Sequence, residues 1–597
     1  MHKVIDLEPR AWLDSQPMEG GDLVMHYLEQ LGVEYVFGVP GGAIEPLYNA
    51  LARSARRGGP RAVVARHETG AAFMADGYAR ESGRLGVCCA TTGPGATNMI
   101  TGVASAFDNR IPMLVLTAQT ALPSFGRGAV QESSCTGVNT LAMFAGCTRY
   151  NTLVSHPEQL EHKLVAALMT ALAPPRGPAH LSVPLDLLRT RVAARPQDHI
   201  AHLAGGAEAV DYKACAELTR RLAQARKPVL VVGEGAREAA GLLETLAWNR
   251  SIPLLCTPHG KGLVNPWHPC FCGVFGFAGH DSARAVLSDP DVDLVVAAGT
   301  GLGEWASDGW ASSALLSERL VHVDALVTNL VRSPMASLHV IGHPAPVFEF
   351  VLERLRPGRL SGPRGTLAGA VQQAINREQL PFRLDDQTGW RADLHPLKPQ
   401  RLMRELARCF PAGTRFFADN GNSMVWGIHY LHPRSMLVGG GRRVSEGDFR
   451  ACLEFAPMGW AIGSAVGAAF ADPRRPMVCI TGDGSLLMSG QELTVAVQHH
   501  LPVVFVVLND SALGMVRHGQ RLGGAERIGY ALPEVDLVAM AQAMGARGQR
   551  IDSAQDLLGL DVAAMLGADR PTLLDVRIDP DEVPPMAARV RALQGGV

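Results

Sequence analysis

Short runs of apolar and β-branched residues alternate with longer, Ala-rich stretches of helical character through most of the chain. This alternation is typical of parallel α/β domains, because a strand that is buried on both faces reads as a continuous apolar run. The runs fall into three groups, so we predict an α/β protein with three doubly wound parallel-sheet domains. The predicted limits are a tail at 1–19, domains at 20–190, 205–355 and 396–580, a linker at 356–395 and a tail at 581–597.

Composition narrows the class of partner. At 597 residues the chain is too long for one hydrophobic core. Lys and Arg number 55 and Asp and Glu 57, a balance that gives no sign of a nucleic-acid partner. The start of the chain lacks the apolar core of a signal peptide, and no apolar run reaches the roughly 20 residues that span a bilayer. We therefore expect a cytoplasmic protein that binds small molecules, with no nucleic-acid partner and no membrane partner.

The cysteine pattern favours reduced thiols. The 11 cysteines are scattered and form no CxxC pair, which argues against a disulfide framework. His268, Cys270 and Cys272 in WHPCFC are spaced by single residues and lack a fourth ligand, so we predict a loop there and no zinc site.

Polar residues follow several of the apolar runs. In open α/β sheets ligands bind beyond the carboxyl ends of the strands, so the candidate site consists of the endings VARHE, CATTGPG, FFADNG, ITGDG and VVLND. In ITGDG a single carboxylate, Asp483, stands between Gly482 and Gly484. Glycines let the backbone approach an anion closely, and the carboxylate can hold a cation. Taken alone, GDG is also common as an ordinary turn.

The next predicted strand gives this acid a partner. PVVFVVLND ends in Asn509 and Asp510, and Asp510 comes 27 residues after Asp483. That separation fits one strand–helix–strand excursion, which returns the chain to the same edge of the sheet. Two oxygen ligands would then face one pocket, and Mg²⁺ takes one or two carboxylates together with phosphate oxygens and water. The spacing therefore predicts a site for a metal-bound diphosphate.

Four motifs in this order resemble the thiamine-diphosphate enzymes. GDGS followed by LND resembles the GDG…NN signature of that family, and GDGSLLMSGQEL with LPVVFVVLNDSALGMV is similar to its acetolactate synthase branch. VFGVPGGAIEPLYNAL, RHETGAAFMADGYAR and TTGPGATN extend the resemblance over almost the full length. The resemblance implies a pyrimidine-binding, a middle and a diphosphate-binding domain, with thiamine diphosphate and Mg²⁺ as cofactors.

The resemblance also implies which residues bind the cofactors. Asp483, Asp510 and the backbone carbonyl of Ala512 would bind the metal, and Asp510 stands where the family has Asn, which adds a negative charge. The cofactor-binding residues implied in the same way are Gly41, Gly42, Glu68, Pro94, Asn98, Asn420, Gly421, Asn422, Ser423, Met458, Gly482, Asp483, Gly484, Ser485, Asp510, Ala512, Leu513, Gly514 and Met515.

The resemblance implies two catalytic residues and one bulky residue that supports the bent conformation of the cofactor. Glu68 matches the Glu that protonates the cofactor's aminopyrimidine ring, a task that needs a carboxyl group in a largely apolar slot. Gln131 matches a pocket Gln that orients intermediates, and Met458 matches the bulky side chain beneath the bent cofactor. From the residues alone, Glu68 could instead be a helix-start Glu, Gln131 a surface residue and Met458 an ordinary core residue.

The resemblance implies a reaction and an assembly. We expect a carboligase that decarboxylates a 2-keto acid, with pyruvate as donor, and transfers the acyl carbanion to a carbonyl acceptor. A 2-keto acid decarboxylase, a cyclic 1,2-dione hydrolase, a flavin-dependent pyruvate oxidase and a non-catalytic homologue are the alternatives. Retention of Glu68, Asp483 and Asp510 argues against the last of these. Because the family brings this Glu to a cofactor held by another subunit, we expect a homodimer at minimum, and a homotetramer as the assembly.

Three departures from the acetolactate synthase pattern qualify the expected reaction. GMVRHGQ has Gly519 where those enzymes have Trp, so we expect a wider or more polar acceptor space. The segment 439–455 is longer than usual and basic at Arg442 and Arg443; it either helps to bind an anionic or larger acceptor or is a solvated loop. GTGLGEW, at 299–305, lacks the Arg-Phe-Asp-Asp pattern of that family, so the sequence does not support bound FAD.

Overall fold

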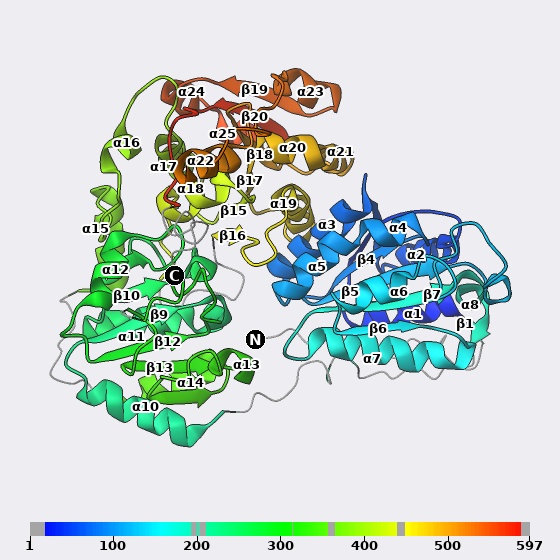
Figure 1. Cartoon of the computed structure of the whole chain (residues 1–597), viewed down its shortest axis with the longest axis horizontal. Coiled ribbons are helices and arrows are strands. Elements are labelled where there is room, and N and C mark those ends of the chain that lie inside the picture. Colours follow the sequence, from blue (N-terminus) through cyan, green and yellow to red (C-terminus); the bar gives the residue numbers. More distant parts are fainter. Residues whose placement is uncertain are drawn as a thin grey trace. The chain divides into compact units, whose positions relative to one another are not determined.

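The computed structural model describes residues 18–192, 200, 202, 210–312, 314–355, 365–438 and 448–586. Figure 1 shows three β-sheets that follow one another along the chain, each packed with helices. Each of the three has six strands, and the strand pairs recorded in them are all parallel. The predicted α/β class with three parallel sheets is therefore confirmed. By its contacts the chain divides into two compact units, one within 1–75 and 84–206 and the other within 76–83 and 207–597.

The first unit is built on one sheet in the order β3-β2-β4-β5-β7-β6, beside an antiparallel pair of β1 and β8. Its strands are β1 (Met18–Glu19), β2 (Tyr35–Val39), β3 (Arg61–Val64), β4 (Gly86–Ala90), β5 (Met113–Gln119), β6 (Tyr150–Leu153), β7 (Pro178–Pro184) and β8 (Arg191–Val192). Its helices are α1 (Gly20–Gln30), α2 (Glu45–Arg56), α3 (Glu68–Ser82, whose last residues belong to the second unit), α4 (Pro94–Asn98), α5 (Ile100–Asp108), α6 (Thr140–Ala145), α7 (Leu160–Leu172) and α8 (Leu185–Arg189).

The second unit holds two sheets, in the orders β11-β10-β9-β12-β13-β14 and β16-β15-β17-β18-β20-β19. The strands of the first are β9 (Pro228–Val232), β10 (Leu254–Cys256), β11 (Phe271–Val274), β12 (Leu294–Ala298), β13 (Leu320–Asp324) and β14 (Leu338–Ile341). The strands of the second are β15 (Arg415–Ala418), β16 (Phe449–Ala451), β17 (Met477–Gly482), β18 (Val504–Asn509), β19 (Arg547–Ile551) and β20 (Thr572–Arg577).

Helices cover both sheets of the second unit. Those that accompany the first sheet are α10 (Tyr212–Gln224), α11 (Ala240–Arg250), α12 (Asp281–Ser288), α13 (Val327–Leu330) and α14 (Pro344–Arg354). Between the sheets come α15 (Leu367–Asn376), α16 (Gln387–Arg391) and α17 (Pro399–Cys409). Those that accompany the second sheet are α18 (Asn422–Tyr430), α19 (Trp460–Ala471), α20 (Asp483–Ser489), α21 (Leu493–Gln498), α22 (Gly514–Gly523), α23 (Leu537–Ala543), α24 (Ala554–Leu558) and α25 (Val562–Leu566).

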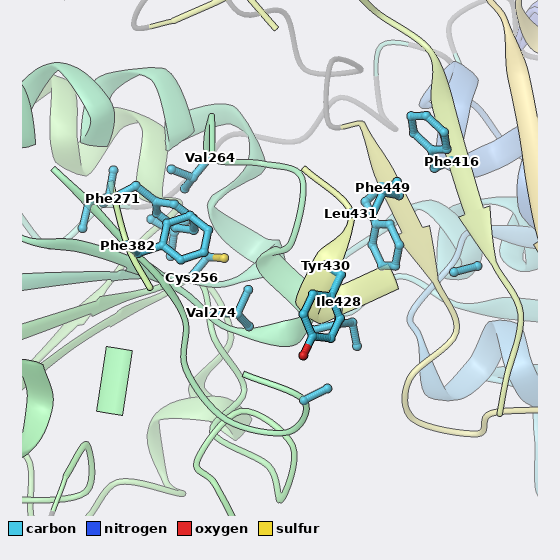
Figure 2. Packing of buried hydrophobic residues seen from close by; sticks show 14 of the residues in the cluster. Cys256, Val264, Phe271, Val274, Phe382, Phe416, Ile428, Tyr430, Leu431 and Phe449 are labelled. Atoms are coloured by element: carbon cyan, nitrogen blue, oxygen red, sulfur yellow. The ribbon is translucent and has the colours of Figure 1, made fainter. Parts of the chain in front are cut away.

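One hydrophobic cluster runs through both sheets of the second unit. It contains Val232 and Val296 from the first sheet and Val478 and Val506 from the second, all fully buried. Figure 2 shows part of this cluster, including residues of α18 and of the neighbouring strands. Because the apolar faces of both sheets are covered within the same cluster, the two sheets pack as one body.

Within the three six-stranded sheets, five strands lie outside the apolar runs of the sequence: β6, β11, β14, β16 and β19. Each of them stands at the edge of its sheet. An edge strand has a neighbour on one side only and needs no continuous apolar run, as the sequence RGQRI of β19 illustrates. The predicted loop at WHPCFC is wrong in one respect for the same reason, since Phe271 and Cys272 begin edge strand β11.

Candidate active site

β15, β17 and β18 are neighbours in the last sheet, and they end together. In the parallel register Ala418 pairs with Ile480 and Gly482 pairs with Leu508, so the carboxyl ends share one edge. Beyond these ends the chain continues with Asp419 and Asn420, with Asp483, and with Asp510.

Asp483 sits at a junction between strand and helix rather than in a loop. β17 ends at Gly482 and α20 begins at Asp483, whose residue surface is 5% exposed. Burial, and after it the charge of Asp510, raises the pKa of Asp483 to about 7. The N–H of Gly484 donates to Asp483 Oδ1 at 2.8 Å and works against that shift. A cation bound here would favour the ionised form, because it compensates both burial and the second carboxylate.

The loop after β18 presents Asp510 and the Ala512 carbonyl. Between them Ser511 has a φ of 51°, a left-handed conformation that is unusual for a residue other than glycine. Two backbone hydrogen bonds fix this turn: Leu513 N donates to Tyr530 O at 2.7 Å, and Leu532 N donates to Ser511 O at 2.9 Å. Strained backbone of this kind concentrates at functional sites, and the sequence carries no signal for it.

Glycine contacts show which side chains meet at this edge. A Cβ placed on Gly514 would lie 2.5 Å from Asn422 Nδ2 and 2.9 Å from Asp510 Oδ2. A Cβ placed on Gly484 would lie 2.7 Å from Leu513 Cδ2 and 3.5 Å from Met458 Cε. The loop after β18 therefore lies against both α18 and α20.

The remaining predicted residues of this set lie on the same elements. Met458 is half-buried and is not part of the hydrophobic core, which disfavours its reading as an ordinary core residue. Ser423, Ser485 and Met515 lie in the first turns of α18, α20 and α22.

These residues fit a diphosphate and a divalent cation. Asn420 Oδ1, Asn422 Oδ1 and Arg517 Nη2 are buried without a hydrogen-bond partner among the described residues, so the edge holds polar atoms that protein groups do not satisfy. Gly421, with a φ of 104°, precedes the first N–H groups of α18, a position that suits an anion. Asp483, Asp510 and the Ala512 carbonyl are oxygen donors of the kind that Mg²⁺ prefers.

Asp419 has a role that the sequence did not reveal. Its carboxylate accepts hydrogen bonds from Gly459 N at 2.9 Å and Ala461 N at 3.2 Å, and from Thr481 Oγ1 at 2.9 Å. The start of α19 is therefore capped by a protein carboxylate. Asn420 Nδ2 donates to Pro457 O at 2.7 Å, so both residues hold the segment that carries Met458.

In the first unit, Glu68 lies beside the predicted cofactor residues of the same sheet. Glu68 begins α3, its residue surface is 9% exposed, and its Oε2 accepts a hydrogen bond from Asn98 Nδ2 at 3.0 Å. A Cβ placed on Gly95 would lie 3.3 Å from Glu68 Oε1. A Cβ placed on Gly41 would lie 2.7 Å from Thr91 Cβ.

The TTGPGATN motif and the Gly pair after β2 complete this set. Pro94 is the first residue of α4, where its missing N–H costs nothing. A Cβ placed on Gly42 would have no atom within 4 Å, so this glycine borders open space.

Gln131 is exposed and strained, and buried polar groups hold it. Its φ is 59°. Thr92 Oγ1 lies 2.9 Å from Gln131 O and 2.7 Å from Ser133 Oγ, and Gln119 Nε2 donates to Ser133 Oγ at 2.9 Å. Thr92, Gln119 and Ser133 are fully or almost fully buried. The hydrogen bond from Thr92 therefore fixes the backbone of Gln131, while its side chain stays exposed.

A small cavity lies beside the strand-end turns of the middle sheet. The strand-end turns after β9 and β12 touch, since Gly235 N donates to Gly299 O at 2.8 Å. The cavity beside them has a volume of about 10 Å³ and is lined by Glu234, Arg237, His259 and Lys261 among others. That is room for about one water molecule, so this cavity by itself does not hold an isoalloxazine ring.

Some predictions cannot be placed. Of the segment 439–455, residues 439–447, with Arg442 and Arg443, lie outside the described residues. In the described ranges no helix combines the length and the apolar character that crossing a membrane requires.

Comparison with known proteins gives a consistent result. The chain matches the family models for the thiamine pyrophosphate enzyme N-terminal TPP binding domain over residues 18–139, the central domain over 215–351 and the C-terminal TPP binding domain over 419–576. Acetolactate synthase isozyme 2 large subunit of Escherichia coli K12 is 31% identical over 97% of this chain and 100% of its own length. Isozyme 1 large subunit of the same organism is 29% identical over 95% and 96%. The acetolactate synthase large subunit of Parasynechococcus marenigrum WH8102 is 30% identical over 94% and 88%.

Proposed function

This chain belongs to the thiamine pyrophosphate enzyme family, with acetolactate synthase large subunits among its relatives, and on that premise we propose that it is a carboligase acting on 2-keto acids. Pyruvate is the proposed donor, and a second small carbonyl compound is the proposed acceptor. Thiamine diphosphate, when bound, supplies the carbon nucleophile that permits loss of CO₂ and transfer of the acyl unit.

One observation carries this proposal. Asp483, Asp510 and Asn422 meet at the shared carboxyl edge of three neighbouring strands, beside buried polar atoms without protein partners among the described residues. The two carboxylates and the Ala512 carbonyl would hold Mg²⁺, and the start of α18 would take the diphosphate. The placement of Met458 against Gly484 supports its assignment beneath the cofactor rings.

Glu68 and Gln131 are the proposed catalytic residues. Glu68 holds a proton at the pyrimidine ring of the cofactor, and its hydrogen bond from Asn98 keeps the carboxyl group oriented for this task. Gln131 orients the substrate, and its strained backbone, held by Thr92, keeps the side chain available.

We propose a homodimer at minimum, in which Glu68 of the partner subunit serves each cofactor. Large apolar side chains beside both halves of the predicted site support this assembly. Val130, next to Gln131, is 86% exposed, and Leu487 and Met488, shortly after Asp483, are 42% and 55% exposed. A second copy of the chain would cover them. A homotetramer built from two such dimers is the proposed full assembly.

The acceptor space is proposed to be wider than in the acetolactate synthases. A Cβ placed on Gly519 would meet no atom within 4 Å, so the position is open as well as small. A larger side chain at this place would fill the opening, and its absence favours a bulkier or more polar acceptor.

The function is tested by product analysis. Purified protein with thiamine diphosphate and Mg²⁺ is incubated with pyruvate and a panel of carbonyl acceptors, and products are identified by mass spectrometry, with a parallel sample in EDTA. We expect hydroxyketone or acetohydroxyacid products that depend on Mg²⁺. Free aldehyde as the only product would indicate a decarboxylase. Formation of an acid from a cyclic 1,2-dione in the panel would indicate a hydrolase. No turnover of any of these compounds would indicate a non-catalytic homologue.

An absorbance scan of the same protein tests the flavin. Because GTGLGEW at 299–305 lacks the Arg-Phe-Asp-Asp pattern, we expect no visible flavin bands in the purified protein. Bands that remain after gel filtration would contradict this and reopen an oxidase reaction.

A further inference from the structure

The carboxylate of Asp510 faces a cation. Asp510 follows β18, and Arg517 lies in the first turn of α22, with Oδ2 and Nη2 3.7 Å apart. The Asp510 side chain is 7% exposed and that of Arg517 is 18% exposed. The backbone N–H of Arg517 donates to Leu513 O at 3.1 Å. The start of the helix therefore holds the guanidinium group against the loop that carries the acid.

Three other acids near this helix pair with cations other than Arg517. Lys398 Nζ lies 2.8 Å from Asp579 Oδ2 and also pairs with Glu582. Arg521, one turn further along α22, pairs with Asp581 at 3.7 Å. Within the part of the chain that the structure describes, the ion pair of Arg517 is with Asp510.

The guanidinium group also keeps an unused donor at the site. Arg517 Nη2 is buried and makes no hydrogen bond to any described residue, because 3.7 Å is an ion-pair distance and too long for a hydrogen bond. A buried charged donor without an acceptor is unfavourable until a ligand oxygen or a carboxylate compensates it.

Resting on the proposed function, we propose that Arg517 is a positioning residue that balances the charge of Asp510, so that the two side chains act as one unit in holding the metal-bound diphosphate. An Asn at position 510 would leave Asp483 as the only carboxylate on the metal. Asp510 keeps the oxygen ligand but adds a negative charge beside the phosphates. A guanidinium group 3.7 Å away cancels that charge where screening by water is weak.

Coupling between the two residues is the measurable consequence. Binding of thiamine diphosphate in the presence of Mg²⁺ is measured by calorimetry for wild type, D510N, R517Q, R517K and D510N/R517Q. We expect R517Q to weaken binding about 10- to 100-fold, as for loss of one partner of a largely buried ion pair, and R517K to retain most of the affinity. In the D510N background the same R517Q change should cost less than about threefold.

R521Q is the matched control, since Arg521 lies on the same helix and pairs with an acid at the same distance. It should leave the affinity unchanged in both backgrounds. Thermal unfolding without cofactor gives a second readout. R517Q should lower the melting temperature when Asp510 is present but not in the D510N background, because a repulsion between two carboxylates arises only with Asp510.

The outcomes separate the inference from the function on which it rests. Equal losses from R517Q in both backgrounds, or no loss in either, would refute the charge balance while leaving the carboligase proposal intact. Failure of the wild-type protein to bind thiamine diphosphate would overturn the proposed function and this inference with it.

Discussion

Glu68 occupies the first residue of α3, where its carboxylate is largely buried and bonded to Asn98. We expect Glu68→Gln to keep the fold and the cofactor affinity, because the amide has the same shape and can accept from Asn98. Turnover should fall about 10²- to 10⁴-fold, since the proton donor to the pyrimidine ring is gone. Steady-state kinetics with calorimetry in parallel measures both quantities.

Glu45→Gln is the control for this substitution. Glu45 also begins a helix, α2, but it is exposed and pairs with Arg189 at 3.0 Å on the surface. It should turn over like the wild type. Wild-type turnover in Glu68→Gln itself would remove the assigned role.

Position 484 has no room for a side chain in the present packing. A Cβ there would come within 2.7 Å of Leu513 Cδ2, closer than van der Waals contact allows. We expect Gly484→Ala to lower the free energy of unfolding by about 1–3 kcal/mol, as overpacking does. Chemical denaturation of the cofactor-free protein measures this loss.

A second substitution tests the cause of that loss. Leu513→Ala makes room, so Gly484→Ala should cost less in that background than in the wild type. Additive losses would show that the contact with Leu513 is not responsible.

Asp483 and Asp510 were predicted from the separation of two apolar runs, and Glu68 from the resemblance to the thiamine-diphosphate enzymes. Asp419 could not, because its hydrogen-bond partner Gly459 is 40 residues away and precedes a helix whose direction the pattern does not specify. The left-handed backbone of Ser511 was equally hidden, since a serine carries no sign of it. Local sequence reveals which residue types stand at a strand end, and tertiary packing decides what each one contacts.

Among the elements, the loop of residues 120–139 depends on buried side chains beneath it. Gln119 ends β5 and donates to Ser133. We expect Gln119→Leu to loosen this loop, because the buried backbone N–H of Ser133, which donates to Gln119 Oε1 at 3.3 Å, loses its partner at a cost of about 1–3 kcal/mol. The loop should then be cleaved by trypsin about tenfold or more faster in the native protein, and KM should rise more than kcat falls.

Gln159→Leu serves as the comparison. Gln159 accepts from Ser155 at the surface, before α7. Its loss should change neither cleavage of the 120–139 loop nor KM. Unaltered cleavage in Gln119→Leu would show that the loop does not depend on this network.

Strands show how far periodicity carries a fold prediction. The central strands, such as β5 with MLVLTAQ, are buried along their whole length and stood out as apolar runs. The strands that were missed, such as β14 with LHVI, have one neighbour and partial exposure, so few positions had to be apolar. The pattern therefore predicted the central strands of each sheet and missed all the edge strands except β3.

At the scale of the whole molecule, buried histidines set an acid limit. Burial lowers the pKa of His429 to about 4 and that of His322 to about 4, from 6.5. Between these pKa values the folded state binds fewer protons than the unfolded state. The contribution of the two histidines to the free energy of unfolding is therefore fully present above about pH 6.5 and is lost as the pH falls. It should fall by about 1.4 kcal/mol per pH unit for each histidine between pH 6.5 and 4.

Chemical denaturation at a series of pH values measures this slope. Replacing His322 by Gln should reduce the slope of unfolding free energy against pH by the contribution of one histidine, about 1.4 kcal/mol per pH unit. The comparison isolates the imidazole from groups of opposite sign, such as Asp483, whose raised pKa favours the folded state in acid. Equal slopes in variant and wild type would rule the histidine out.

The proposed dimer predicts complementation between two inactive chains. Co-expressed Glu68→Gln and Asp483→Ala chains should form mixed dimers with one intact site, which takes Glu68 from one chain and Asp483 from the other. Random pairing then gives about a quarter of the wild-type activity. Separately purified variants, assayed alone, provide the baseline. Activity no higher than their sum would place both residues of a site on one chain.

The hydrophobic cluster that joins the two sheets of the second unit limits how such a chain can be recombined. A chimaera that takes β9–β14 from one relative and β15–β20 from another divides a core whose side chains pack across both sheets, such as Val232 and Val478. Voids and clashes would appear along the seam. A chimaera that folds should therefore take residues 210–586, with both sheets of the second unit, from the same parent.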